Sequence, residues 1–205
     1  MYDPAMVAFC DDVTAFILAG GKSTRMGRDK AFVMLDGRSL LDRQLDLARS
    51  VCAAVRIVGD PAKLSQFAPV VEDAFRGCGP LGGIHAALRS SETDLNLLVA
   101  VDIPFVSAQF LEFLLAKSRA SESMVIVART SDGWQPLCAV YRRGFAELAE
   151  KALRASRFRI DALFDPARTL VIGQDELRQQ GFLPDLFRNL NTPEELSDAR
   201  SVTGQ

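Results

Sequence analysis

Several features that mark other protein classes are scarce or absent in this chain of 205 residues. With four scattered cysteines, one histidine and no Cys-x-x-Cys pair, we expect reduced thiols and no structural zinc. No segment reaches the length of a membrane-spanning helix, and residues 1–12 lack the pattern of a signal peptide. The net charge of −2 gives no reason to expect a nucleic acid or a membrane as partner. These absences predict a cytoplasmic protein with a disordered tail at 1–12 and one domain at 13–205.

Two common phosphate-binding motifs are also missing from the most distinctive segment, a basic glycine-rich loop at residues 18–30. Gly21-Lys22-Ser23 resembles the end of a Walker A motif, but Phe16 stands where that motif needs its first glycine. The loop has no G-x-G-x-x-G either. It follows the apolar run 14–19 and combines three glycines with lysine and arginine side chains. Glycine lets backbone N–H groups approach an anion and the cations neutralise it, so the loop predicts a site for a small phosphate-bearing ligand.

Patterns typical of strands and helices alternate along the chain. Ser39 and Ser107 are predicted to cap helices, because each precedes apolar residues at helical spacing. Glycine-rich residues 77–83 are predicted to form a turn before another helix. Strands are predicted at 14–19, 55–58, 70–71, 95–101, 124–128, 137–141 and 170–172. The alternation predicts a three-layer α/β fold with a mostly parallel sheet.

Acidic residues follow two of these predicted strands. Asp102 comes directly after the apolar run 95–101, and Asp73 comes shortly after 70–71. Ligands of such sheets bind at the carboxyl ends of the strands, and Mg²⁺ prefers carboxylate and phosphate oxygens. Asp102 is therefore a candidate Mg²⁺ ligand; the alternative is a helix cap or a surface ion pair. Asp73 is a weaker candidate, since it could simply begin a loop.

These residues carry a resemblance to a known family. The segment Leu18-Ala19-Gly20-Gly21-x-Ser23-x-Arg25-Met26-Gly27-x-Asp29-Lys30 resembles the signature loop of nucleotidyltransferases with a Rossmann-like α/β fold. Gly79-Pro80-Leu81-x-Gly83 and the ending 189–196, Asn-Leu-Asn-Thr-Pro-Glu-Glu-Leu, resemble MobA-type molybdenum cofactor guanylyltransferases. The resemblance runs from about residue 14 to about residue 200.

The resemblance implies an activity and a set of partners. Enzymes of this type join GMP from GTP to molybdopterin and release pyrophosphate, with Mg²⁺ as cofactor. Proteins that insert molybdenum and chaperones of molybdoenzymes are implied as further partners, and we expect a monomer. The family often has Asn where this chain has Gly59 or Asp60, so a contact with the nucleotide there is missing or passes to the backbone. The implied site comprises Leu18, Ala19, Gly20 and Gly21 on the nucleotide, Lys30 on its phosphates, Asp73 beside the guanosine and Asp102 on Mg²⁺.

The chemistry of such a transfer suits these residue types. Arg25 and Lys30 are predicted to hold the β- and γ-phosphates and, with Asp102, to be the catalytic residues, since catalysis here is positioning plus neutralisation of charge. The attacking phosphate is already an anion, so no general base is required. His85 is accordingly interpreted as a structural or surface residue.

Candidates for the second substrate are less specific. Asn189, Asn191 and Arg157 are predicted substrate contacts; the alternatives are a turn shaped by the two asparagines and a solvated basic loop. Trp134, at the start of a predicted strand, could stack on a pterin or simply pack at the sheet edge.

Other functions remain open at this point. A cytidylyltransferase on the same cofactor and a sugar-phosphate nucleotidylyltransferase share the loop, and choice of base depends on the pocket around Leu18, Gly82 and Gly83. A non-catalytic nucleotide-binding protein is a more remote alternative. The presence of both Lys30 and Asp102 favours an enzyme.

Overall fold

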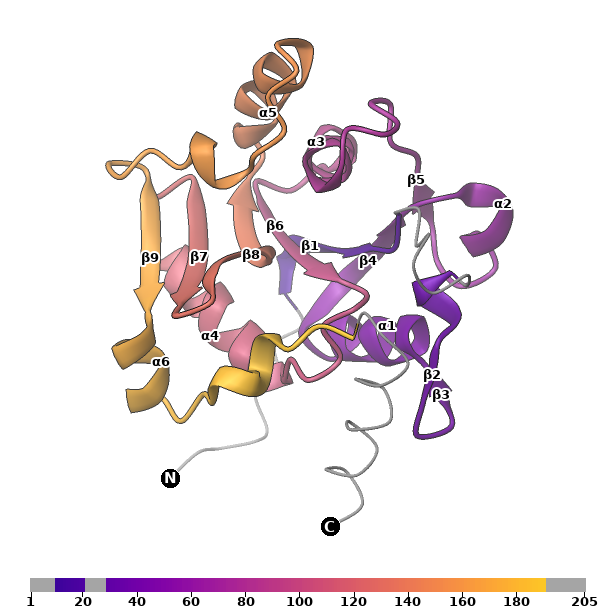
Figure 1. Ribbon diagram of the computed structural model, residues 1–205, viewed down its shortest axis with the longest axis horizontal. Coiled ribbons are helices and arrows are strands. Elements are labelled where there is room, and N and C mark those ends of the chain that lie inside the picture. The colour runs from indigo at the N-terminus through magenta and orange to yellow at the C-terminus, as the bar shows by residue number, and fades with distance from the viewer. Residues whose placement is uncertain (1–9, 21–28, 191–205) are drawn as a thin grey trace.

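Seven strands form the central sheet, in the order β5-β4-β1-β6-β8-β7-β9 (Figure 1). The structure is a computed structural model that describes residues 10–20 and 29–190. All neighbouring strands pair in parallel except β8, which is antiparallel to both β6 and β7. The strands are β1 (Cys10–Leu18), β4 (Cys52–Val58), β5 (Val70–Val71), β6 (Leu95–Ala100), β7 (Val125–Thr130), β8 (Gly133–Arg142) and β9 (Thr169–Gly173). The predicted α/β fold with a mostly parallel sheet is confirmed.

Helices cover both faces of this sheet. In Figure 1, α1 (Leu40–Val51) and α4 (Ala108–Arg119) lie below it, whereas α3 (Pro80–Ser90) and α5 (Phe145–Arg154) lie above it. A separate hairpin of β2 (Met34–Leu35) and β3 (Arg38–Ser39) precedes α1. The short elements are η1 (Lys30–Phe32), α2 (Pro61–Leu64), η2 (Asp161–Leu163), α6 (Gln174–Gln179) and η3 (Pro184–Phe187).

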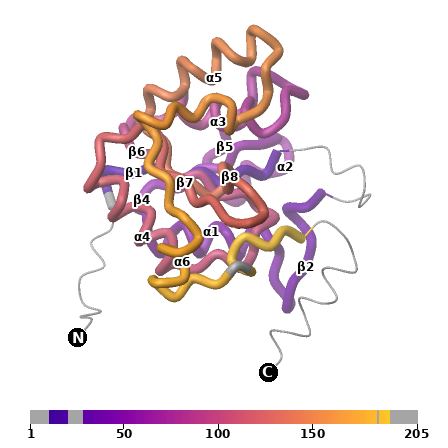
Figure 2. The backbone as a smooth tube through the Cα atoms, turned by 60° about the vertical axis from the view of Figure 1, so that its left-hand side comes forward, coloured from indigo at the N-terminus to yellow at the C-terminus, as the bar shows by residue number. Residues whose placement is uncertain are grey.

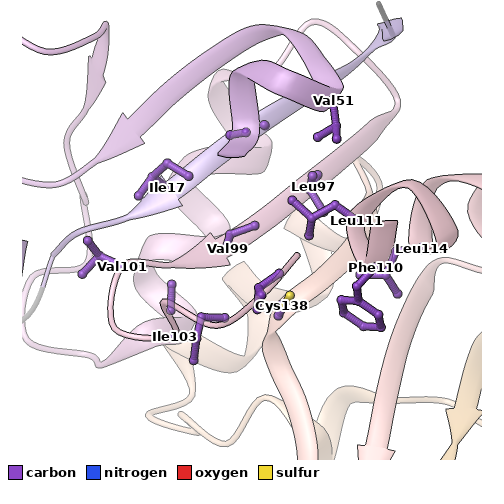
Figure 3. Packing of buried hydrophobic residues seen from close by; sticks show 14 of the residues in the cluster. Ile17, Val51, Leu97, Val99, Val101, Ile103, Phe110, Leu111, Leu114 and Cys138 are labelled. Carbon is purple, nitrogen blue, oxygen red and sulfur yellow. The ribbon is translucent and has the colours of Figure 1, made fainter. Parts of the chain in front are cut away.

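The hydrophobic core is divided by the sheet into two clusters, one on each face. Successive side chains of a strand point to opposite faces, so Ile17 of β1 packs with α1 and α4 while Phe16 packs with α3. Every residue of β6 is buried, as expected for a central strand covered on both faces. Figure 3 shows Leu97 of β6 beside Leu111 of α4.

The two predicted serine caps are confirmed. The Ser39 hydroxyl accepts a hydrogen bond from the backbone N–H of Asp42 (3.0 Å) at the start of α1. The Ser107 hydroxyl accepts one from the N–H of Phe110 (3.3 Å) at the start of α4. Both bonds satisfy N–H groups that the helix itself leaves without a partner.

Two expectations about individual segments were wrong. Residues 80–83 belong to α3 and not to a turn, because Pro80 occupies the first helical position, where its missing N–H costs nothing. β1 begins at Cys10, inside the segment assigned to the tail, because the strand extends along β4 with Cys10 opposite Cys52. The short helices α2 and α6 were not predicted at all. The capping box at 192–195 lies outside the described residues.

Among the described residues, no helix combines the length and the hydropathy needed to cross a membrane. In the described part of the chain, Cys78 and Cys138 carry free thiols.

Candidate active site

The carboxyl ends of β1, β4 and β6 meet at one edge of the sheet. The backbone N–H of Ala19 donates to the carbonyl of Val58 (3.0 Å), and the N–H of Val101 donates to the carbonyl of Leu18 (3.1 Å). The residues at which the glycine-rich loop begins are therefore fixed between the ends of the two neighbouring strands. This is the edge at which parallel α/β sheets bind their ligands.

Lys30 and Asp102 meet at this edge although 72 residues separate them in the chain. Lys30 Nζ lies 2.7 Å from Asp102 Oδ2. Their side chains are 25% and 21% exposed, so the pair is partly shielded and still open to a ligand. An ion pair was the alternative interpretation of Asp102, and the structure shows one. Its partner, however, is Lys30, which is itself predicted to bind the phosphates.

The turn that carries Asp102 is anchored from two distant parts of the chain. The side-chain amide of Gln44, buried in α1, donates to the carbonyl of Ile103 (2.8 Å). The backbone N–H of Leu190 donates to the carbonyl of Asp102 itself (2.9 Å). In both views the last described segment runs from α6 back across the molecule (Figures 1 and 2). This bond brings the exposed Asn189 next to the Asp102 turn.

Asp73 packs directly against the first turn of α3. Its Oδ1 accepts a hydrogen bond from the N–H of Phe75 (2.7 Å). A Cβ atom added to Gly82 would lie 2.5 Å from Asp73 Oδ2, so only glycine allows this approach. The positive end of a helix dipole favours a carboxylate at this place. Asp73 is thus held against the first turn of α3, in a contact that depends on the missing side chain of Gly82.

The donor set at this edge fits Mg²⁺. Among the described residues no three His, Cys, Asp or Glu side chains are grouped to hold a metal ion. A metal here would therefore depend on the carboxylate of Asp102 together with oxygens of the substrate. Mg²⁺ is bound in this way in many phosphoryl-transfer sites, through one or two carboxylates plus phosphates.

His85 is a buried residue of α3, outside this edge. Its ring packs edge-on against Phe75, with centroids 5.0 Å apart, and its Nε2 lies 3.7 Å from a carboxylate oxygen of Glu150 on α5. Burial lowers the pKa of His85, and the nearby Glu150 opposes this effect. The structure supports a role in packing between α3 and α5.

Some predicted site residues remain without structural support. Gly21, Arg25 and Asn191 lie outside the described residues. Arg157 is exposed in the segment after α5, and among the described residues no hydrogen bond or ion pair joins it to Asp102. Its predicted contact with the second substrate stays a prediction.

One cationic side chain at this edge was not predicted from the sequence. Arg129 lies near the end of β7, and its guanidinium carbon stands 4.9 Å from the centre of the Trp134 ring on β8. Trp134 also packs edge-on against Phe164, at 5.2 Å between centroids. Trp134 therefore packs against its neighbours at the sheet, as one of its two interpretations, packing at the sheet edge, predicted. The Asp132-Gly133 turn signal between the two strands could have indicated the hairpin.

Comparison with known proteins gives the family. Residues 15–167 match the MobA-like NTP transferase domain. The chain belongs to this family. The chain is similar to the molybdenum cofactor guanylyltransferase of Desulfosudis oleivorans. The two are 38% identical over 197 residues, which cover 94% of this chain and 96% of that protein. A probable molybdenum cofactor guanylyltransferase of Pelotomaculum thermopropionicum is 34% identical over 189 residues, covering 91% of both.

Solved structures agree with this family. The molybdopterin-guanine dinucleotide biosynthesis protein A of Archaeoglobus fulgidus superposes with a TM-score of 0.80 at 26% identity, covering 93% of this chain and 98% of that one. A 4-diphosphocytidyl-2C-methyl-D-erythritol synthase of Anaerococcus prevotii superposes with a TM-score of 0.70 at 15% identity, covering 95% and 97%. The second likeness shows the fold alone.

Proposed function

We propose that this protein transfers GMP from GTP to molybdopterin, which gives molybdopterin guanine dinucleotide and pyrophosphate. The observation that carries the proposal is the 2.7 Å pair of Lys30 and Asp102 at the end of β6, beside the glycine-rich loop. The named relatives, similar over nearly the whole chain, support this choice of substrates. In the reaction, an oxygen of the molybdopterin phosphate forms a bond to the α-phosphorus of GTP. The bond from that phosphorus to the leaving pyrophosphate breaks.

The protein's part in this reaction is to position charges. Lys30 binds phosphate oxygens of GTP and neutralises charge as pyrophosphate leaves, while Arg25 is assigned the same task from the sequence. Asp73 lies beside the guanosine, and the backbone at Gly20 approaches the phosphates. Asp102 holds Mg²⁺, which when bound supplies positive charge to the reacting phosphates.

The residues that bind the acceptor substrate, molybdopterin, are assigned to the same edge of the sheet. Asn189 contacts molybdopterin, since the Leu190 bond holds it next to the Asp102 turn. Arg157 and Asn191 remain candidates for further contacts with this substrate. The acceptor phosphate needs no base from the protein, because it is already an anion near neutral pH.

Pyrophosphate release tests the proposal. The protein is incubated with Mg²⁺, molybdopterin and each of the four NTPs in turn, and pyrophosphate is measured with and without molybdopterin. We expect release only with GTP and molybdopterin together, and none from Asp102→Asn. A preference for CTP would overturn the guanylyl assignment. Release with a sugar phosphate in place of molybdopterin would move the function to sugar-nucleotide synthesis.

A further inference from the structure

At the carboxyl end of β6, Asp102 divides this edge of the sheet into two parts, one with the glycine-rich loop and one formed by β8 and β7. The loop after β1 and Asp73 after β5 lie on one side of β6 in the strand order, and β8 and β7 lie on the other. Since β8 runs antiparallel to β6, its first residues reach the edge at which β6 ends. The two sides of Asp102 thus offer separate places for the two substrates of a transfer reaction.

The turn between β7 and β8 brings Arg129 and Trp134 together at this second side. The two residues are directly opposite each other across the antiparallel pair, so their side chains share a face. The register shifts just before them: between the pairs Val127–Ala139 and Arg129–Trp134, β7 has one residue and β8 has four. Such an irregularity bends the strand and redirects its side chains, a device common beside active sites.

The guanidinium of Arg129 lies over the indole of Trp134, with its central carbon 4.9 Å from the ring centre, and remains available to a ligand. The ring of Trp134 is half-buried and held from its edge by Phe164, which makes it a firm support. Arg129 is exposed, and among the described residues no carboxylate lies within ion-pair distance of it. A planar cation stacked on an aromatic ring keeps its N–H donors and its outer face free.

We infer that Arg129, positioned by Trp134, binds the planar ring of the acceptor substrate. This inference rests on the proposed function, since it assigns the second substrate to the same sheet edge. β7 is two strands away from β6, about 10 Å at the usual spacing of about 4.8 Å between strands. A phosphate at Asp102 would leave the ring of the same molecule at about this distance. The guanidinium then lies beside the edge of the ring and donates hydrogen bonds from its in-plane N–H groups to the nitrogen and oxygen acceptors of the ring.

The single tryptophan of the chain provides a readout besides activity. Trp134 is the only tryptophan, so all tryptophan emission comes from this site. Free pterin is titrated into the protein while its emission is recorded, first alone and then with Mg-GTP at saturation. We expect saturable quenching that persists with GTP bound. Quenching that GTP abolishes would place pterin in the guanine pocket and overturn the inference.

Variants separate recognition of the acceptor from folding and from GTP binding. Arg129→Gln should raise the KM for molybdopterin about tenfold, as expected for loss of hydrogen bonds from a charged group, and leave kcat and the KM for GTP unchanged. Trp134→Phe keeps an aromatic support and should cost less than threefold, whereas Trp134→Leu should approach Arg129→Gln. Arg168→Gln is the matched control, because Arg168 is exposed just before β9, at the opposite edge of the sheet.

The possible failures are distinguishable. If the wild type releases pyrophosphate but Arg129→Gln keeps the molybdopterin KM within twofold of it, the inference is wrong and the proposed function stands. An equal rise of that KM in Arg168→Gln would also overturn it, since the effect would then be one of overall charge. No pyrophosphate release by the wild type with any NTP would refute the proposed function, and the pterin titration alone would then decide on Arg129.

Discussion

Two adjacent glycines of α3 allow a matched test of the position of Asp73. A Cβ on Gly82 would meet the Asp73 carboxylate, with Oδ2 at 2.5 Å, and must displace it. A Cβ on Gly83 would meet only Val58 and Leu18, at ordinary distances of 3.6 and 3.7 Å. Both glycines lie in the helix without positive φ angles, so both gain helix propensity when replaced by alanine. We expect Gly82→Ala to weaken GTP binding more than Gly83→Ala does.

The expected changes in stability follow from two opposing terms. Replacing glycine by alanine within a helix stabilises by up to about 1 kcal/mol. In Gly82→Ala the moved carboxylate also loses its 2.7 Å hydrogen bond from the N–H of Phe75, which costs about 1.5–3 kcal/mol for a charged acceptor. Gly82→Ala should therefore unfold about 0.5–2 kcal/mol more easily than the wild type. Gly83→Ala should be the more stable of the two, by about 2–4 °C in Tm for each kcal/mol.

Thermal unfolding and calorimetry with Mg-GTP provide the assay. We expect Gly82→Ala to bind GTP about tenfold more weakly, the equivalent of one lost hydrogen bond of about 1.4 kcal/mol. Equal GTP affinity in the two alanine variants would refute the assignment of Asp73 to the nucleotide. Equal Tm values would show that Asp73 moves aside without cost.

Further variants address the phosphates and the buried histidine. Asp102→Ala should abolish pyrophosphate release, which corresponds to a loss of at least about 3 kcal/mol in transition-state stabilisation, while calorimetry still detects bound GTP. Near-normal release would show that Asp102 only pairs with Lys30. Lys30→Ala and Arg25→Ala should weaken the binding of GTP strongly and the binding of GMP barely, as measured by competition binding. Equal effects on the two nucleotides would exclude contacts of these side chains with the outer phosphates. Because burial holds the pKa of His85 below its ordinary value of about 6.5, the unfolded chain binds a proton that the folded chain rejects, and the free energy of unfolding falls as pH drops below about 6.5. His85→Leu should flatten this dependence between about pH 7 and pH 5 in denaturant unfolding, and an unchanged slope would assign it to other groups.

The fold could be predicted from the sequence wherever one local pattern decided the structure. The apolar run 95–101 and the serines before α1 and α4 are of this kind. Residues 80–83 were misjudged because two opposing local signals meet there, glycines that favour a turn and a proline that favours the start of a helix. The apolar residues of β8 do not show the direction of the strand, and only the Asp132-Gly133 turn signal before them could have indicated that β8 runs antiparallel to β7.

The site was predictable to the extent that strand order brings its residues together. Lys30 and Asp102 could be placed at one edge because each follows a strand or its loop, and their 2.7 Å contact agrees with this. The close approach of Asp73 to Gly82 depends on packing between a loop and a helix, which no spacing of residues reveals. Arg129 was missed because its partner lies across an irregular antiparallel pair.

The hairpin of β7 and β8 joins two neighbouring strands through a short turn, so the proposed acceptor site lies in one continuous segment of the chain. Insertions at its tip, residues 131–132, do not lengthen any connection that leads to the glycine-rich loop or to Asp102. The nucleotide half, in contrast, is assembled from segments that bridge separate strands, so a change there moves several parts at once. Selection or engineering could therefore exchange the hairpin tip to admit a new acceptor while the machinery for the nucleotide stays intact.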